Sequence, residues 1–504
     1  MKRWFTKLTT AVLVVVASLS ASVDSRAEFA PDAAVIRVLI MRHDTAEAAR
    51  LLEYTNRGSP AIATENARLR LYTGDCDRVA EAAASVPHDE ETDHMLEVAE
   101  GCARVTAGVT VVTDAPSGVE VRFQDESDQA MFPLIVDTVV SSRAMLEREL
   151  GADWPRPTRI VVVRDQLSLS AMTGLPYAAA KTTGTAAVAK WGKVTMISPR
   201  AMAFGFDWRD TLAHELTHLA LTRLTIDRAP LWLQEGFAKR QQVRWREPNP
   251  FDARSNPELT VRDGIAKKLD LPLDKLGNSL ATLPSAQQAS VAYAEVESFC
   301  GFLVRETSID TMRSFFSELR SVNTVDDALK KATSAPLGDW EKRWRAWLSR
   351  LPVLAPKPPV TQAVKGVRKL NERMRLFELL ERRGDRDAAL VELGDIGQAP
   401  FDPRAATLRG RGLEAAGKAD EAWSLAQPER LTGGSGPWWA LRARLASTRD
   451  PGMSLAASER AVSEDPFGFE AACQARPFTE APQVLLRPAL CAASRALDVP
   501  PSEP

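Results

Sequence analysis

The pentapeptide His214-Glu215-Leu216-Thr217-His218 constrains the fold of this chain more than any other feature. Residues four apart lie on the same face of an α-helix, so His214 and His218 can direct two imidazole nitrogens at one metal ion. Glu215, one step around the helix, can reach a water molecule on that ion. Histidine is scarce, with 5 in 504 residues, and none follows His218. The sequence therefore predicts a metal-binding helix whose remaining ligand is not a downstream histidine.

The pattern His-Glu-x-x-His is typical of a zinc-binding helix, so Zn²⁺ is the expected cofactor. A catalytic zinc ion takes three protein ligands and keeps a fourth position for water. Since no later histidine is present, the third ligand is expected to be a carboxylate. Three carboxylates follow the motif closely enough to be candidates: Asp227, Glu235 and Glu247.

A second motif follows at residues 232–238, Trp-Leu-Gln-Glu-Gly-Phe-Ala. Together with the pentapeptide it resembles the gluzincin zinc metallopeptidases, in particular their peptidase-MA-like branch. The resemblance implies that Glu235 is the third zinc ligand and that Glu215 is the general base of peptide-bond hydrolysis by a zinc-activated water. The chain departs from its relatives at Lys239, where they carry an acidic residue that orients a zinc ligand.

The resemblance also implies how a protein or peptide substrate is held. In that family the edge strand before the zinc helix pairs with an extended peptide, and here that strand is expected to include Gly184, Thr185, Ala186 and Ala187. The alternative is an ordinary covered strand. Tyr293 is the candidate donor to the oxyanion of the reaction, with Tyr177 as a second candidate. The alternative for Tyr293 is a half-buried packing role.

The expected fold class is α+β, with a zincin-type catalytic domain of a small mixed sheet and helices between two mostly α-helical repeat regions. Hydrophobic patterns predict strands at 119–123, 159–163, 184–188 and 193–197. They predict helices at 128–150, 208–221 and 230–240, and residues 246–290 are expected to form an extended surface excursion before helices resume at Tyr293. The catalytic domain is expected to cover 118–350.

The flanking regions, 31–108 and 366–500, contain short Gly/Asp turns followed by Ala-rich segments. The N-terminal turns are at 42–49 and 73–80, and the C-terminal turns are at 383–389 and 416–422. This spacing is typical of tetratricopeptide-like helical repeats, which can bind a protein partner. The alternative is a non-repeating helical bundle. A Pro-rich linker is expected at 351–365.

Residues 1–27 have the pattern of a signal peptide, with basic residues, a short apolar run and small residues at the cleavage site. The chain is therefore expected to be exported, periplasmic or secreted, with no stable membrane span after signal removal; the alternative is an uncleaved anchor. In an oxidising compartment, disulfides are expected between Cys76 and Cys102 and between Cys473 and Cys491. Cys300 is expected to be a buried apolar residue.

The formal net charge of -2 gives no reason to expect a nucleic acid or an anionic membrane as partner. Two functions from different classes fit these features. One is an exported zinc metallopeptidase. The alternative is an exported helical-repeat scaffold whose catalytically silent peptidase-like domain binds protein.

Overall fold

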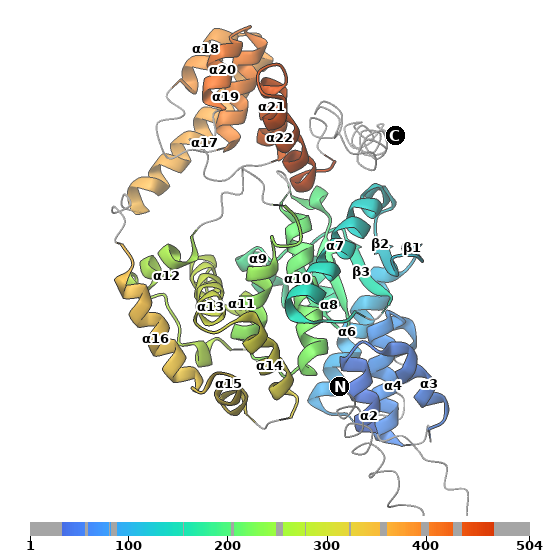
Figure 1. Ribbon diagram of the computed structural model, residues 1–504. Coiled ribbons are helices and arrows are strands. Elements are labelled where there is room, and N and C mark those ends of the chain that lie inside the picture. The colour runs from blue at the N-terminus through green and yellow to red at the C-terminus, as the bar shows by residue number, and fades with distance from the viewer. Residues whose placement is uncertain are drawn as a thin grey trace, which may run out of the picture.

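The computed structural model is mostly helical, with one small mixed five-stranded sheet near its centre (Figure 1). It describes residues 33–55, 59–79, 81, 88–154, 156–202, 206–247, 256–277, 279–321, 324–352, 360–394, 403–426 and 436–467. The predicted signal peptide and the predicted Cys473–Cys491 pair lie outside these residues. The predicted α+β class is confirmed. Within the described residues, no helix combines the length and hydropathy required to cross a bilayer.

The sheet has the strand order β1-β2-β3-β5-β4. Its strands are β1 (Thr110–Asp114), β2 (Val119–Phe123), β3 (Thr158–Val163), β4 (Ala187–Lys190) and β5 (Lys193–Ile197). The β2–β3 and β3–β5 pairs are parallel, and the outer pairs β1–β2 and β4–β5 are antiparallel. The predictions at 119–123 and 193–197 are confirmed, and β3 begins one residue before its predicted start. β1 was not predicted.

The edge strand β4 begins at Ala187, three residues later than predicted. The preceding segment forms helix α9 (Tyr177–Thr183), which ends at Gly184 with φ of 70°. Alanine favours helix, and glycine in the left-handed conformation ends it, so the chain becomes extended only after this cap. Of the four residues predicted to bind substrate, only Ala187 lies in the strand. Trp191 and Gly192 form the turn between β4 and β5, and both residues have positive φ.

Helices cover both faces of the sheet. Side chains of one face, including Val121, Val162 and Met196, pack in the same core as α7 (Phe132–Leu150) and α10 (Trp208–Thr225). Side chains of the other face, including Val161 and Ile197, pack with α6 (Glu90–Thr106) and α8 (Gln166–Thr173). Because β3 is buried on both faces, its residues 160–163, Ile-Val-Val-Val, form an uninterrupted apolar run.

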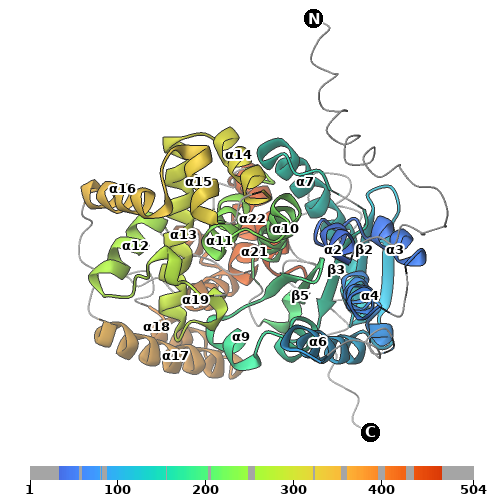
Figure 2. The same cartoon turned by 90° about the horizontal axis from the view of Figure 1, so that it is seen from below.

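A helical subdomain follows α10 and lies on the opposite side of it from the N-terminal helices (Figures 1 and 2). It comprises α11 (Leu231–Gln241), α12 (Pro257–Ala266), α13 (Ala286–Glu306), α14 (Ile309–Leu319), α15 (Val325–Thr333) and α16 (Leu337–Arg350). The prediction of an extended surface excursion is wrong where α12 forms. Pro257 is the first residue of this helix, and the Asn256 side chain caps it by accepting a hydrogen bond from Leu259 N. Helix α13 starts at Ala286, so Tyr293 lies inside it and not at its start.

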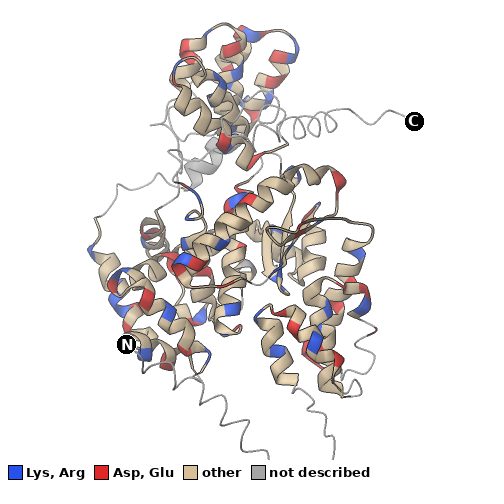
Figure 3. Cartoon of the chain, turned by 45° about the vertical axis from the view of Figure 1, so that its right-hand side comes forward, with Lys and Arg blue, Asp and Glu red and all other residues tan. Residues whose placement is uncertain are grey.

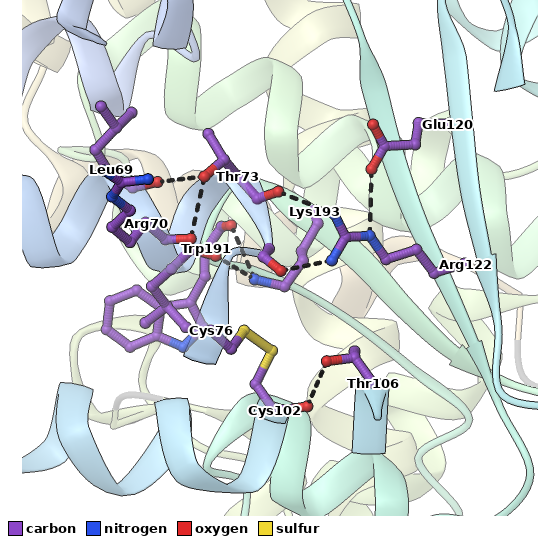
Figure 4. The surroundings of a disulfide bond; sticks show 12 residues. Leu69, Arg70, Thr73, Cys76, Cys102, Thr106, Glu120, Arg122, Trp191 and Lys193 are labelled. Atoms are coloured by element: carbon purple, nitrogen blue, oxygen red, sulfur yellow. Dashed lines mark hydrogen bonds and ion pairs between the residues drawn. A yellow bond between two sulfur atoms is a disulfide. The ribbon is translucent and has the colours of Figure 1, made fainter. Parts of the chain in front are cut away.

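The N-terminal region packs against the β4–β5 hairpin. Its elements are α2 (Ala33–Met41), α3 (Thr45–Glu53), α4 (Pro60–Thr73), η1 (Cys76–Arg78) and α6. The predicted Cys76–Cys102 disulfide is confirmed and joins η1 to α6 (Figure 4). Close to it, the buried Lys193 of β5 donates a hydrogen bond of 2.7 Å to the carbonyl oxygen of Leu71 at the end of α4.

The C-terminal region consists of helical hairpins. Its helices are α17 (Val360–Arg382), α18 (Arg386–Glu392), α19 (Pro403–Ala415), α20 (Ala419–Leu425), α21 (Gly436–Ala446) and α22 (Pro451–Glu464). Gly384 and Gly417 occupy two of the predicted turns with φ of 84° and 73°. Helix α17 begins at Val360, inside the range predicted as linker. Short 3-10 helices complete the fold: η2 (Glu126–Met131), η3 (Pro199–Ala201), η4 (Leu273–Lys275) and η5 (Leu280–Thr282).

Acidic and basic side chains are interspersed over the described helices (Figure 3). This distribution agrees with the small net charge of the chain.

Candidate metal centre

Helix α10 places both histidines of the pentapeptide on one face. It is buried along most of its length, and it ends at Ile226, which has φ of 54°. The Nε2 atoms of His214 and His218 lie 3.2 Å apart. The predicted helix at 208–221 is confirmed and extends to Thr225.

Helix α11 brings Glu235 to the same point. The Oε2 atom of Glu235 lies 3.3 Å from His214 Nε2 and 3.5 Å from His218 Nε2. Gly236 allows α11 to pack closely against α13, because a Cβ atom at this position would lie 2.3 Å from Cys300 Sγ and 2.5 Å from Val296 O. Cys300 is buried and free, as predicted. Among the described residues, His214, His218 and Glu235 form the one group of this kind that could hold a metal ion.

These three residues fit a zinc ion. In a tetrahedral site with ligand distances of 2.0–2.1 Å, neighbouring ligand atoms lie about 3.3 Å apart. The three observed separations, 3.2, 3.3 and 3.5 Å, agree with that geometry. Glu235 Oε2 is buried and has no hydrogen-bond partner, so it retains a lone pair for a cation. Two imidazoles and one carboxylate are also a donor set that catalytic zinc uses.

Burial and mutual charge shift the pKa of every group here. Burial lowers the pKa of His214 to about 4. Burial also opposes charge on His218, but the Glu235 carboxylate outweighs it and raises the pKa of His218 to about 9. For Glu235, burial favours the neutral acid, yet the positive charge of His218 and the close approach of both imidazoles lower its pKa below the usual range. Without a cation, the cluster therefore holds its proton on His218.

Glu215 lies beside the three candidate ligands and under the edge strand. The backbone N–H of Ala189 in β4 donates a hydrogen bond of 2.7 Å to Glu215 Oε2. Burial raises the pKa of Glu215 to about 7. A carboxyl group with a pKa near neutrality can both accept and return a proton, which is the requirement for a general base that later acts as an acid.

A cleft of about 720 Å³ opens over these residues. It is lined by residues of α10, α11, β4 and α13, and the lining includes His214, Glu215, His218, Glu235, Ala187, Thr185 and Tyr293. Gly184 and Ala186 do not line it. Tyr293 is mostly buried, and the ammonium of Lys239 lies 5.7 Å from the centre of its ring. Burial raises the pKa of Tyr293 well above its usual value, so the hydroxyl keeps its proton.

The other candidates lie elsewhere. Asp227 lines the cleft but is outside the metal-binding group. Glu247 is exposed and does not line the cleft. Tyr177 is 42 % exposed at the start of α9 and also does not line it.

Gln234 is a site residue that the sequence did not suggest. His218 Nδ1 donates a hydrogen bond of 3.0 Å to Gln234 Oε1, which leaves Nε2 free to bind a metal. Lys239, at the position where an acid was expected, instead donates to Gln242 Oε1 at 2.9 Å. The signal that could have identified Gln234 is its position directly before the ligand on α11.

Residues 139–350 match the model of the Peptidase MA superfamily. The match begins inside α7 and ends at the last residue of α16, so it contains α10 and the whole helical subdomain from α11 to α16. It supports a peptidase-like hydrolase domain of the peptidase-MA type. Among curated proteins, none matches this chain.

Proposed function

We propose that this protein is a zinc metallopeptidase that hydrolyses peptide bonds in the cleft of its peptidase-MA-like domain. The observation that carries the proposal is the convergence of three ligand atoms, 3.2 to 3.5 Å from one another, next to the buried carboxyl group of Glu215. His214, His218 and Glu235 would hold the zinc ion. When bound, zinc acts as a Lewis acid and lowers the pKa of water toward neutrality.

Glu215 takes the proton of the attacking water and passes it to the leaving amine. Its Oε2 is held by the N–H of Ala189. No hydrogen bond to its Oε1 occurs within the described residues, so this oxygen is the one available for proton transfer. The hydrogen bond also couples the base to β4, which fixes the carboxyl group relative to a substrate on that strand.

The free edge of β4 can bind an extended peptide by strand addition. Ala186 accepts a hydrogen bond from Ile197 N, so its peptide groups face β5. Peptide groups alternate in direction along a strand, which turns those of Ala187 and Ala189 toward the free edge. Because the N–H of Ala189 is engaged by Glu215, the groups left for a substrate are the N–H and C=O of Ala187 and the C=O of Ala189.

Tyr293 is the donor to the oxyanion that develops during attack. It lines the cleft opposite β4 from α13 and keeps its hydroxyl proton. A hydrogen bond from this hydroxyl strengthens as negative charge develops, and such donors accelerate acyl transfer.

Metal analysis beside a catalytic variant tests the proposal. The parent and Glu215→Gln are expected to bind about one zinc ion per chain, because both proteins keep the three proposed ligands. The parent is expected to cleave a peptide library, and Glu215→Gln is not. Glu247→Gln, which removes an exposed carboxylate outside the cleft, is the matched control and should cleave like the parent. Zinc binding without cleavage by the parent would instead identify a silent binding scaffold, and absence of zinc from all three proteins would refute the metallopeptidase.

We further propose that the protein acts outside the cytoplasm. The pattern of residues 1–27 and the Cys76–Cys102 disulfide support this, because structural disulfides persist in oxidising compartments. N-terminal sequencing of the mature protein should locate a start close to residue 28. A start at Met1 would contradict signal removal.

A further inference from the structure

A second cavity adjoins the metal cleft. Its volume is about 240 Å³, and it shares the wall residues Ala189, Thr222 and Asp227 with the cleft. The N-terminal region forms its far wall, through residues that include His43, Arg68 and Tyr72. The near wall is the turn of the β4–β5 hairpin. None of the described residues before 108 lines the cleft itself. The N-terminal region therefore contributes to the walls of the second cavity and not to those of the cleft.

The N-terminal helices hold the hairpin turn in a fixed place. The rings of Tyr72 and Trp191 meet edge to face, with centroids 6.2 Å apart. Gly192 adopts φ of 67°, and a Cβ atom there would lie 2.5 Å from the Tyr72 ring. The disulfide next to α4 anchors this wall (Figure 4). The cavity is therefore built by packed elements and not by a loose surface loop.

The position of the cavity places it within reach of a bound peptide. Strand β4 runs from the metal cleft at Ala187 to Lys190 at the cavity wall. A peptide lying along its free edge advances about 3.3 Å per residue, so a side chain two or three residues from the scissile bond reaches the cavity. The volume is enough for one polar side chain and its water.

The two cationic side chains in the cavity wall, Arg68 and Lys190, differ in their ion pairs. Arg68 is paired with Glu65 at 3.0 Å and with Glu91 at 2.8 Å. Lys190, in contrast, has no carboxylate within ion-pair distance among the described residues. Its ammonium lies 3.3 Å from His94 Nε2 and 5.2 Å from the centre of the Trp191 ring.

Asp227 is a carboxyl group of the same cavity wall. It accepts a hydrogen bond of 3.4 Å from Thr222 Oγ1. Burial raises the pKa of Asp227, and the charges of Arg68 and Lys190 oppose that shift. The charge interaction between Asp227 and Lys190 thus acts over a distance longer than an ion pair.

We propose that this cavity is a specificity subsite that accepts an acidic side chain of the substrate, with Lys190 as its charged partner. The proposal rests on the proposed peptide-binding function of the cleft. A substrate carboxylate would give Lys190 a direct ion pair, and charge-assisted hydrogen bonds of this kind are stronger than neutral ones. The N-terminal helical region then takes part in substrate selection.

Binding of defined peptides to the zinc-loaded Glu215→Gln protein tests this proposal without requiring turnover. The probes are fluorescein-labelled alanine-rich decapeptides that carry a single Glu, Gln or Lys at each successive position. At one position, Glu is expected to bind about 10-fold more tightly than Gln, as for a hydrogen bond to a charged group. Lys190→Met should remove this preference, and Lys190→Glu should transfer it to Lys. Lys181→Glu, a charge reversal on the exposed side of α9, should leave it unchanged.

Three results would overturn the subsite: no position at which Glu and Gln differ, a preference that survives in Lys190→Met, or no binding by any peptide. Cleavage of the same peptides by the parent protein is scored separately. Glu-selective binding without cleavage refutes the peptidase and retains the subsite. Cleavage without any dependence on Lys190 refutes the subsite and retains the peptidase.

Discussion

His218 Nδ1 and the side-chain oxygen of Gln234 are 3.0 Å apart, and they join the helix of the two histidines to the helix of Glu235. Lys239, four positions after Glu235, donates to Gln242 Oε1. The acceptor for His218 is instead the residue directly before Glu235. The other histidine differs, because His214 Nδ1 is buried without a hydrogen-bond partner in the described structure.

Replacement of Gln234 should weaken metal binding. Gln234→Leu removes the acceptor that fixes the ring and the tautomer of His218, and loss of such a partner lowers metal affinity roughly 10- to 100-fold. Gln234→Glu keeps an acceptor and should retain most of the affinity. Competition with a chromophoric chelator measures these affinities. Gln287→Leu, on the exposed surface of α13, is the control, and a Gln234→Leu protein that binds zinc like this control would contradict the assignment.

Gly236 should be required for the close packing of α11 against α13. In Gly236→Ala, the new Cβ would lie 2.3 Å from Cys300 Sγ and 2.5 Å from the backbone oxygen of Val296, so one helix has to move. Overpacking of this kind lowers the free energy of unfolding by about 1–3 kcal/mol. Because Glu235 precedes Gly236, zinc affinity should fall as well. Denaturant unfolding and chelator competition measure the two effects.

Gly301→Ala provides the matched control for that change. Gly301 also lies in α13, but a Cβ atom there would meet nothing within 4 Å. Alanine is a better helix former than glycine by about 0.8–1 kcal/mol, so this variant should be as stable as the parent or more stable. Equal destabilisation by both substitutions would show that helix packing at Gly236 is not the cause.

The helix of His214 and His218 and the convergence of Glu235 on it could be predicted because both depend on local sequence motifs. His214 and His218 are one helical turn apart, and Glu235 lies in a compact motif that resembles a family. The Cys76–Cys102 disulfide could also be predicted from the sequence, since both residues belong to one short helical region. Strands β2 and β5 were predicted because their β-branched and apolar residues are buried in the sheet.

Other features depend on tertiary contacts that a local pattern does not contain. The predicted start of β4 is too early because the alanines at 178–180 favour a helix, which continues to Thr183. The role of Gln234 follows from the crossing of α10 and α11. The second cavity combines residues from positions 41–91 with residues from 189–227, so it exists only after the N-terminal region has packed against the hairpin.

Loss of the Tyr293 hydroxyl should slow hydrolysis without removing the metal. Tyr293→Phe keeps the ring that packs near Lys239 and removes one donor to the developing oxyanion. Loss of such a donor lowers kcat about 10²-fold, with KM little changed. Zinc content should equal that of the parent. Tyr177→Phe, outside the cleft, is the control, and equal kcat for Tyr293→Phe and the parent would limit Tyr293 to packing.

Glu295 should make the protein less stable as the pH rises from about 5 to 8. Burial raises the pKa of this carboxyl group to about 8, and the charge of Arg345 only partly opposes the shift. Because the folded pKa exceeds the unfolded value of 4.5, the folded state holds the extra proton, and its stabilising effect is lost as the pH rises through 8. The slope reaches at most about 1.4 kcal/mol per pH unit.

Glu295→Gln imitates the protonated acid and can still accept the 3.1 Å hydrogen bond from Leu271 N. The variant should match the parent at pH 5 and exceed it in stability at pH 8, because glutamine has no proton to lose. Thermal unfolding across this range, with the exposed Glu306→Gln as control, measures the difference. If the parent and Glu295→Gln show the same pH slope, then the Glu295 carboxyl group is already ionised in the folded protein, and its ion pairing with Arg345, 3.8 Å away, outweighs its burial.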